Sequence, residues 1–157
     1  MDFAIVIAHF AVILRDYCNW LEGRPLTAER EHFEAMRLVS ALYAGAIALP
    51  ELRQCASADH DSPALLEPQR KAIMVRLKEF PFQYYWEIYD PILPKPEAPV
   101  CGDITDDLAD IYYDLKPGLI LFEAGHEMAA AWQWRCMFSH WGDHATSAIR
   151  ALHRFEP

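Results

Sequence analysis

The first twenty residues carry apolar side chains at intervals of three and four, which is the spacing of one face of an α-helix. The stripe comprises Phe3, Val6, Ile7, Phe10, Leu14, Tyr17 and Leu21. Ile5, Ala8 and Val12 make the opposite face apolar as well. We therefore expect a helix from Phe3 to about Glu22 that lies at the centre of the protein and is covered on several sides.

Four more segments show helical periodicity or helix-start signals, and together they predict an all-α fold. They lie between Thr27 and Pro50, from Pro68 to Phe80, from 103 to 138 and from about 143 to 154. Pro117 is expected to kink or split the longest helix, because proline lacks the amide donor that a helix interior needs. A turn at residues 139–142 is expected between the last two helices.

The segments between the helices are expected to be extended or irregular. Residues 51–63 are polar and lack periodicity, which indicates a loop. Phe82, Tyr84 and Trp86 alternate as in a short strand or extended segment. Residues 91–99 read PILPKPEAP, and their four prolines favour an extended strap between the N-terminal helices and the C-terminal pair. The prediction is a bundle-like domain of about five helices.

Length and charge limit the classes of function. With 157 residues and 53% hydrophobic composition, residues 1–157 are the size of a single helical domain with a substantial core. A net charge of −9 has the wrong sign for a protein that tracks a phosphate backbone, so we expect no nucleic-acid partner. Asp2 stands where a signal peptide needs basic residues, and His9 interrupts a short apolar stretch. We therefore expect a cytoplasmic protein without a membrane partner.

Five aspartates fall within one arc of about 100° on the helix predicted to start at 103. They are Asp103, Asp106, Asp107, Asp110 and Asp114. The helix dipole favours the first three, which lie in the first turn. Asp110 and Asp114 lie beyond that effect, so they need solvent, basic partners from another helix, or a cation. Like charges three or four residues apart otherwise cost roughly 0.2 to 0.5 kcal/mol per pair.

His140 and His144 share a helical face if the last helix includes Gly142, and imidazoles four residues apart can bind one transition metal. With the aspartates of the preceding helix they would form a mixed oxygen and nitrogen site for a divalent metal. The predicted ligands are Asp106, Asp110, Asp114, His140 and His144. If a turn falls at Gly142 instead, His140 caps a helix or satisfies a buried carbonyl, and Trp141 serves as a packing anchor.

The stretches DDLADIYYDLKPGL and WQWRCMFSHWGDHATSAIRALH, within residues 101–154, resemble a bacterial family of uncharacterised proteins, the domain of unknown function 5063. The family pattern includes Asp106, Asp107, Asp110, His140, Trp141, Gly142 and His144 in this order. Weaker similarity occurs at Leu42-Tyr43, Leu49-Pro50 and Tyr89-Asp90-Pro91. The resemblance implies an acidic, helical bacterial protein whose family domain covers most of the chain. It implies no activity, and it leaves Asp107, Trp141 and Gly142 as motif residues of unknown role.

Two functions remain open, and they belong to different classes. The chain has no phosphate-binding glycine loop and no GxSxG elbow, which favours a non-enzymatic module that binds a protein partner or forms a homo-oligomer. The alternative is a metal-dependent hydrolase of a small phosphate-bearing or similar substrate. In that case the Asp-rich helix and the HWGxH turn would hold a cation that activates water.

Overall fold

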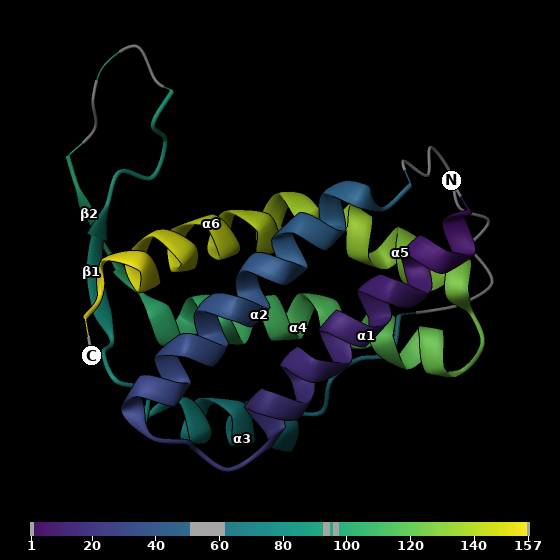
Figure 1. Cartoon of the computed structure of the whole chain (residues 1–157), viewed down its shortest axis with the longest axis horizontal. Helices are drawn as coiled ribbons and strands as arrows, with labels where there is room; N and C mark the ends of the chain where they lie inside the picture. The colour runs from purple at the N-terminus through teal and green to yellow at the C-terminus, as the bar shows by residue number, and fades with distance from the viewer. Residues whose placement is uncertain (1, 51–61, 93–94, 96–97, 157) are drawn as a thin grey trace.

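Helices make up most of the structure, a computed structural model that describes residues 2–50, 62–92, 95 and 98–156. In chain order the elements are α1 (Phe3–Glu22), α2 (Ala28–Ala48), α3 (Glu67–Leu77), β1 (Tyr84–Glu87), β2 (Val100–Asp103), α4 (Ile104–Glu123), α5 (Glu127–Cys136) and α6 (Phe138–Arg154). The helices form one bundle, and the two termini lie toward opposite ends of its long axis (Figure 1). The predicted all-α class is confirmed, with six helices where about five were predicted.

Helix α4 lies at the centre of the bundle, because it packs against α1, α3, α5 and α6. Its buried apolar side chains are Ile104, Leu108, Ala109, Ile111, Tyr112, Leu115, Leu119 and Leu121. The contact with α1 includes a hydrogen bond in which the buried hydroxyl of Tyr17 donates to the carbonyl of Leu108 at 2.7 Å. A buried phenol thereby finds the polar partner that it needs.

Helix α1 has one packed face and one exposed face. Ile5 and Val12 are 67% and 52% exposed, so the prediction that α1 is covered on several sides is wrong. The reason is that α2, α3, α4 and α5 all pack on the stripe that begins with Ile7. Among the described residues, α1 alone is long and apolar enough to cross a membrane, yet 44% of that apolar window is buried inside the protein.

The longest predicted helix is in fact two helices, and the break lies at Gly125 rather than at Pro117. Helix α4 continues through Pro117. It ends where Gly125 adopts a φ of +87°, and the amides of Gly125 and His126 donate to the carbonyls of Phe122 and Leu121 at 3.0 and 2.9 Å. This pair of bonds is a Schellman motif, which glycine favours because it has no Cβ to clash at positive φ.

The turn predicted between the last two helices is absent. Helix α6 begins at Phe138 and runs through Gly142. Met137 alone separates α6 from α5 and serves as the C-cap of one helix and the N-cap of the other. His140 and His144 therefore lie on one face of a continuous helix, which was the condition for a site shared between them.

Two buried tryptophans fix the corner between α5 and α6. The indole N–H of Trp134 donates to the carbonyl of Leu115 on α4 at 3.0 Å. The indole N–H of Trp141 donates to the carbonyl of Trp134 at 3.1 Å. Phe10 of α1 packs on Trp134 with 4.9 Å between ring centroids. Trp141 is thus a packing residue that orients α6 against the rest of the bundle.

The alternating aromatic segment contains strand β1, which pairs antiparallel with β2 so that Tyr85 lies opposite Gly102. The two strands form a hairpin beside the C-terminal end of α6 (Figure 1). Residues 91–99, predicted as an extended strap, connect these strands. Because 93–94 and 96–97 lie outside the described residues, the extended path stays a prediction. The loop predicted at 51–63 likewise lies outside the described residues up to position 61.

A buried ion pair joins α2 to α3. Glu31 is 0% exposed and Arg76 is 8% exposed, and Nη2 of Arg76 lies 2.6 and 2.8 Å from the two carboxylate oxygens of Glu31. Glu31 also accepts hydrogen bonds from the indole of Trp20 at 3.1 Å and from the amide of Leu26 at 2.6 Å. This carboxylate therefore holds α1, the following turn and α3 together.

Replacing Glu31 with glutamine is expected to lower the free energy of unfolding by roughly 3 to 5 kcal/mol, because it leaves the Arg76 charge buried without a counterion. Urea unfolding followed by tryptophan fluorescence measures the loss. Glu34→Gln is the matched control, since Glu34 forms an exposed pair with Arg37 at 2.7 Å on the same helix. That change should cost less than about 1 kcal/mol. Equal losses in the two variants would contradict the role assigned to Glu31.

Candidate functional site

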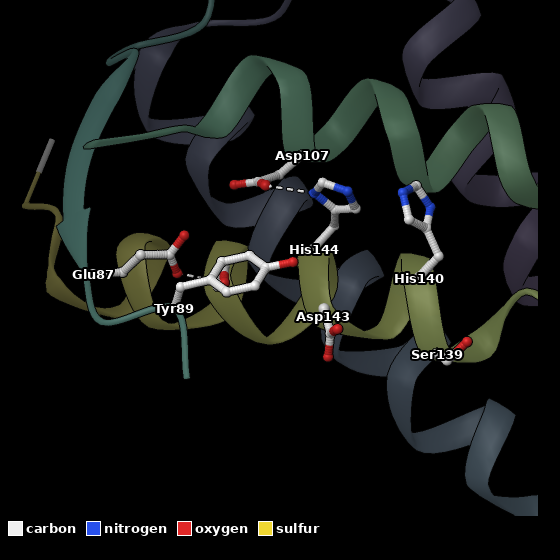
Figure 2. A pocket seen from close by; sticks show the side chains of 8 residues that line it. Glu87, Tyr89, Asp107, Ser139, His140, Asp143 and His144 are labelled. Carbon is white, nitrogen blue, oxygen red and sulfur yellow. Dashed lines mark hydrogen bonds and ion pairs between the residues drawn. The ribbon is translucent and has the colours of Figure 1, made fainter. Parts of the chain in front are cut away.

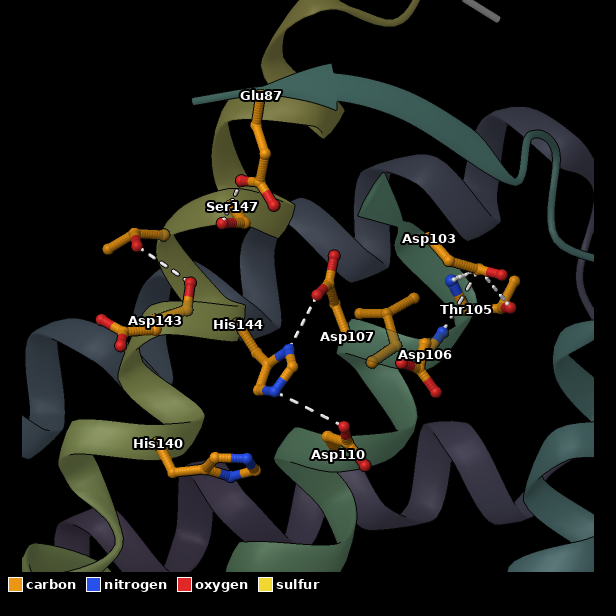
Figure 3. Close-up of polar contacts among 12 residues, drawn as sticks. Glu87, Asp103, Thr105, Asp106, Asp107, Asp110, His140, Asp143, His144 and Ser147 are labelled. Atoms are coloured by element: carbon orange, nitrogen blue, oxygen red, sulfur yellow. Dashed lines mark hydrogen bonds and ion pairs between the residues drawn. The ribbon is translucent and has the colours of Figure 1, made fainter. Parts of the chain in front are cut away.

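Two helices bring carboxylates and imidazoles together at one edge of the bundle. His140 and His144 project from α6 toward α4, as Figure 2 shows. Asp107 Oδ1 lies 2.8 Å from Nδ1 of His144, and Asp110 Oδ2 lies 3.4 Å from its Nε2 (Figure 3). Asp114 Oδ2 lies 2.6 Å from Nδ1 of His140. The contacts run in opposite directions along the two helices, so α4 and α6 are antiparallel.

Asp103 fixes the start of α4 and thereby the direction in which the later aspartates point. Its Oδ1 accepts hydrogen bonds from the amide and the hydroxyl of Thr105 at 2.9 and 2.7 Å. Its Oδ2 accepts one from the amide side chain of Gln83 at 2.9 Å. Burial pushes the pKa of Asp103 upward, but these hydrogen bonds outweigh it and hold the pKa below its ordinary value. Asp103 is thus explained as a helix cap.

Asp107 is buried and orients the imidazole of His144. It accepts a hydrogen bond from the hydroxyl of Tyr85 at 2.5 Å on its second oxygen. Burial and this bond to Asp107 together raise the pKa of Tyr85, which therefore stays a protonated donor. Gly102 makes the arrangement possible, because a Cβ there would lie 2.4 Å from Cζ of Tyr85. The motif residue Asp107 thus positions a neighbouring side chain, and the hairpin supplies its second partner.

The sequence alone did not identify Tyr85 as part of the site. It follows Tyr84 directly, and nothing in the neighbouring sequence distinguishes the two tyrosines. Its role follows from the pairing register that places it opposite a glycine and from the passage of β2 directly into α4. The first of these relations joins residues that lie far apart in the chain.

His144 is held in a position that favours the protonated form. Its hydrogen bond to Asp107 is the main cause of a raised pKa. Burial lowers the pKa, and the negative charges of Asp107, Asp110 and Asp106 raise it further. Because Asp107 occupies Nδ1, the other ring nitrogen faces Asp110 and is the one available to a ligand.

His140 repeats this arrangement one turn earlier in α6. Asp114 occupies its Nδ1, which leaves Nε2 as the nitrogen available to a ligand. The imidazole is 56% exposed while the Asp114 side chain is only 13% exposed, so the carboxylate anchors the ring from the protein side. The two imidazole centroids are 4.9 Å apart in an edge-on arrangement.

Three of the five predicted ligands converge on one point. One donor atom from each of Asp110, His140 and His144 lies within 4.8 Å of the others. Asp114 contacts His140 instead of joining this group. A carboxylate on the second nitrogen of each imidazole is the arrangement that commonly supports histidine ligands at metal sites, since it fixes the tautomer and the ring orientation. The cluster has the donors for one transition metal with two imidazoles and one carboxylate.

Asp106 points away from this group. It lines a neighbouring groove with Arg70, Lys71 and Asp110. Burial raises the pKa of Asp106, and the negative charges of Asp110, Asp103 and Asp107 raise it further. The two remaining motif residues are structural, because Trp141 is fully buried and Gly142 is packed where a Cβ would lie 3.1 Å from the ring of Phe138.

Comparison with known proteins gives a family and a fold. The sequence model of the domain of unknown function DUF5063 matches residues 2–156. No curated protein matches the chain. The structure is similar to the crystal structure of protein BF1032 from Bacteroides fragilis, a structural genomics target, with a TM-score of 0.73 over 98% of this chain and 94% of that one. The two sequences are 22% identical, and the likeness shows the fold alone.

In metal-free protein, Asp107→Asn is expected to lower the pKa of His144, because it replaces a charged hydrogen-bond acceptor with a neutral one while burial continues to lower the pKa. A titration followed by NMR of the imidazole carbons measures this. Asp114→Asn is the matched control, since that carboxylate contacts His140 and should leave the pKa of His144 unchanged. Identical His144 titrations in the wild type and Asp107→Asn would contradict the assignment.

The same shift predicts how stability depends on pH. The folded pKa of His144 is raised above its unfolded value of about 6.5, so the protonated imidazole stabilises the folded state. This contribution is fully present below about pH 6.5 and is lost as the pH rises through the folded pKa. The difference in unfolding free energy between wild type and Asp107→Asn should therefore be larger at pH 6 than at pH 9, measured by urea unfolding.

Proposed function

This chain belongs to the DUF5063 family, whose description names no activity, and we propose from its site that it binds one divalent transition metal between α4 and α6. The ligands are Nε2 of His140, Nε2 of His144 and a carboxylate oxygen of Asp110. The observation that carries the proposal is that one donor atom from each of these three residues lies within 4.8 Å of the others, while Asp114 and Asp107 contact Nδ1 of His140 and His144.

The donor set favours some metals over others. Imidazole nitrogens suit zinc and iron better than magnesium or calcium, which prefer oxygen ligands throughout. Asp107 and Asp114 keep the Nδ1 protons in place, so each Nε2 can offer its lone pair. His144 must lose its Nε2 proton when the metal binds, so affinity should fall as the pH is lowered.

The metal would serve hydrolysis of a small substrate. Three protein ligands leave at least one coordination position for water, as in zinc hydrolases, and a bound divalent ion can bring the pKa of that water to about 7. Both histidines also line a pocket of about 320 Å³, which gives a substrate access to the ion. We place this hydrolase in the cytoplasm.

Metal content measured by mass spectrometry on untagged protein is expected to be about one ion per chain, and Asp110→Ala and His144→Ala are expected to lose it. His153→Ala is the matched control, because His153 is exposed in the last turn of the same helix. Circular dichroism must show that the variants stay folded. Asp107→Asn should weaken binding about 10- to 100-fold, the usual effect of removing a group that supports a ligand.

The absence of bound metal after incubation with zinc, manganese or ferrous iron would refute this proposal. So would variants of Asp110 and His144 that bind metal as tightly as the wild type. Loss of metal together with loss of the folded structure would not distinguish a ligand from a structural residue, and Asp110→Asn, which keeps the shape of the side chain, then decides.

A second candidate function is a module that binds a protein partner or forms a homo-oligomer. It is supported by exposed large apolar side chains on α1 and around the hairpin. They are Phe3, Ile5, Val12, Tyr84, Trp86, Ile88, Tyr89 and Ile92. Contiguous exposed apolar side chains often mark interaction surfaces.

If the hairpin mediates self-association, light scattering should show a dimer at high protein concentration that Trp86→Ala weakens, because Trp86 is 73% exposed. Phe33→Ala, which removes an exposed aromatic residue from α2, is the control and should leave the dimer intact. If the protein is a monomer at all concentrations, self-association is excluded, and the partner in this second function would be a different protein.

A further inference from the structure

The pocket beside the two histidines has walls from three separate parts of the chain: the hairpin, α4 and α6. Its volume is about 320 Å³. It is lined by Glu87, Tyr89, Asp107, Ser139, His140, Asp143, His144 and Ser147. Figure 2 shows the hairpin contributing Glu87 and Tyr89 on one side, while α6 contributes the floor. A substrate that reaches a metal on His140 and His144 from this side therefore touches the hairpin as well.

The lining carries negative charge without a matching positive residue. Glu87, Asp107 and Asp143 contribute carboxylates, and neither lysine nor arginine lines the pocket among the described residues. The charge of Asp107 is balanced by His144. Glu87 accepts a hydrogen bond from the hydroxyl of Ser147 at 2.6 Å, which leaves its charge uncompensated. The Asp143 carboxylate has no hydrogen bond or ion pair with any described residue, so it is free to pair with a ligand.

Tyr89 adds a feature that also favours a positively charged group. Its ring lines the same pocket on the side of Glu87. The face of a tyrosine ring attracts ammonium and guanidinium groups, also at an exposed position such as that of Tyr89. Two uncompensated carboxylates and an aromatic face thus surround one small volume.

We propose that this pocket selects substrates that carry an amine or guanidine group, held by Glu87, Asp143 and Tyr89, next to the bond that is hydrolysed. The inference rests on the proposed metal site and specifies its substrate class. It also argues against the phosphate-bearing substrate expected from the sequence. Apart from the metal ion itself, an anionic group in this pocket would face two carboxylates and neither lysine nor arginine.

A second groove of about 520 Å³, which Asp110 borders, differs from the pocket because it contains basic residues. Arg70 and Lys71 line it together with Glu67, Asp106 and Asp110. The guanidinium of Arg70 stacks on the ring of Tyr113 at 4.4 Å from the centroid. Because Asp110 borders this groove, an anionic substrate would have to reach the same metal from the Arg70 side. The two routes predict opposite charge preferences, which an experiment can separate.

The test uses cobalt-loaded protein and three hydroxamic acids, which bind metals through the same chelating group. The hydroxamate of aminocaproic acid has an amine tail, the monohydroxamate of adipic acid has a carboxylate tail of similar length, and acetohydroxamate has no tail. Changes in the visible spectrum of the cobalt ion give each affinity. The amine-tailed compound should bind roughly fivefold tighter or more than the carboxylate-tailed one.

The double variant Glu87→Gln with Asp143→Asn keeps the shape of the wall and removes its charge. It should bring the two tailed compounds to about equal affinity while acetohydroxamate binds as before. Arg70→Met is the matched control and should leave the preference for the amine unchanged. Equal binding of the tailed compounds by the wild type, or tighter binding of the carboxylate, would overturn the substrate class and leave the metal site standing. Failure to bind cobalt at all would overturn the metal site itself.

Discussion

The structure depends on how α4 combines a buried apolar face with a row of negatively charged aspartates, two properties that oppose each other energetically. The helix packs against four others through a buried apolar face, and it carries five aspartates between its cap and its third turn. Buried carboxylates are tolerated only when they have partners. Asp107 is buried and binds Tyr85 and His144. The half-buried Asp103 and Asp114 bind the first amides of the helix and His140, respectively. Helix α6 and the hairpin must therefore lie where they do for α4 to be stable at the centre.

This requirement also explains why the site lies at the edge between α4 and α6. Repulsion remains between Asp106 and Asp110, and it contributes, after burial, to the raised pKa of Asp106. Asp110 is the aspartate whose contact with a histidine is loosest, at 3.4 Å. A divalent cation placed between Asp110 and the two imidazoles would relieve that repulsion. The histidines and aspartates that balance each other's charge in the folded protein would thus become the metal ligands and the carboxylates that orient them.

The hairpin links the fold to substrate choice. Tyr85, on one face of β1, reaches Asp107 and supports the ligand side of the site. Glu87 and Tyr89, which follow it along the same segment, line the neighbouring pocket. The short segment from Tyr85 to Tyr89 therefore both helps to hold His144 in place, through Asp107, and forms one wall of the pocket that a substrate would enter. Strand β2 leads directly into the Asp103 cap, so the pocket wall and the start of α4 are held in a fixed relation.

The sequence by itself determined that the chain is mainly helical and that it carries an acidic helix face and a pair of histidines, because these features depend on spacings within a few turns. Apolar periodicity gave the bounds of α1 correctly. The break predicted at Pro117 in the long helix from residue 103 was wrong, because that helix ends at Gly125, and a glycine at that place is a local helix-stop signal. Only the tertiary structure decided which carboxylate meets which imidazole, since that follows from the antiparallel packing of α4 on α6. It also decided that Tyr85 joins the site and that Asp106 does not. Those outcomes depend on the register of the two strands and on the packing of the whole bundle. Neither can be predicted from a local sequence pattern.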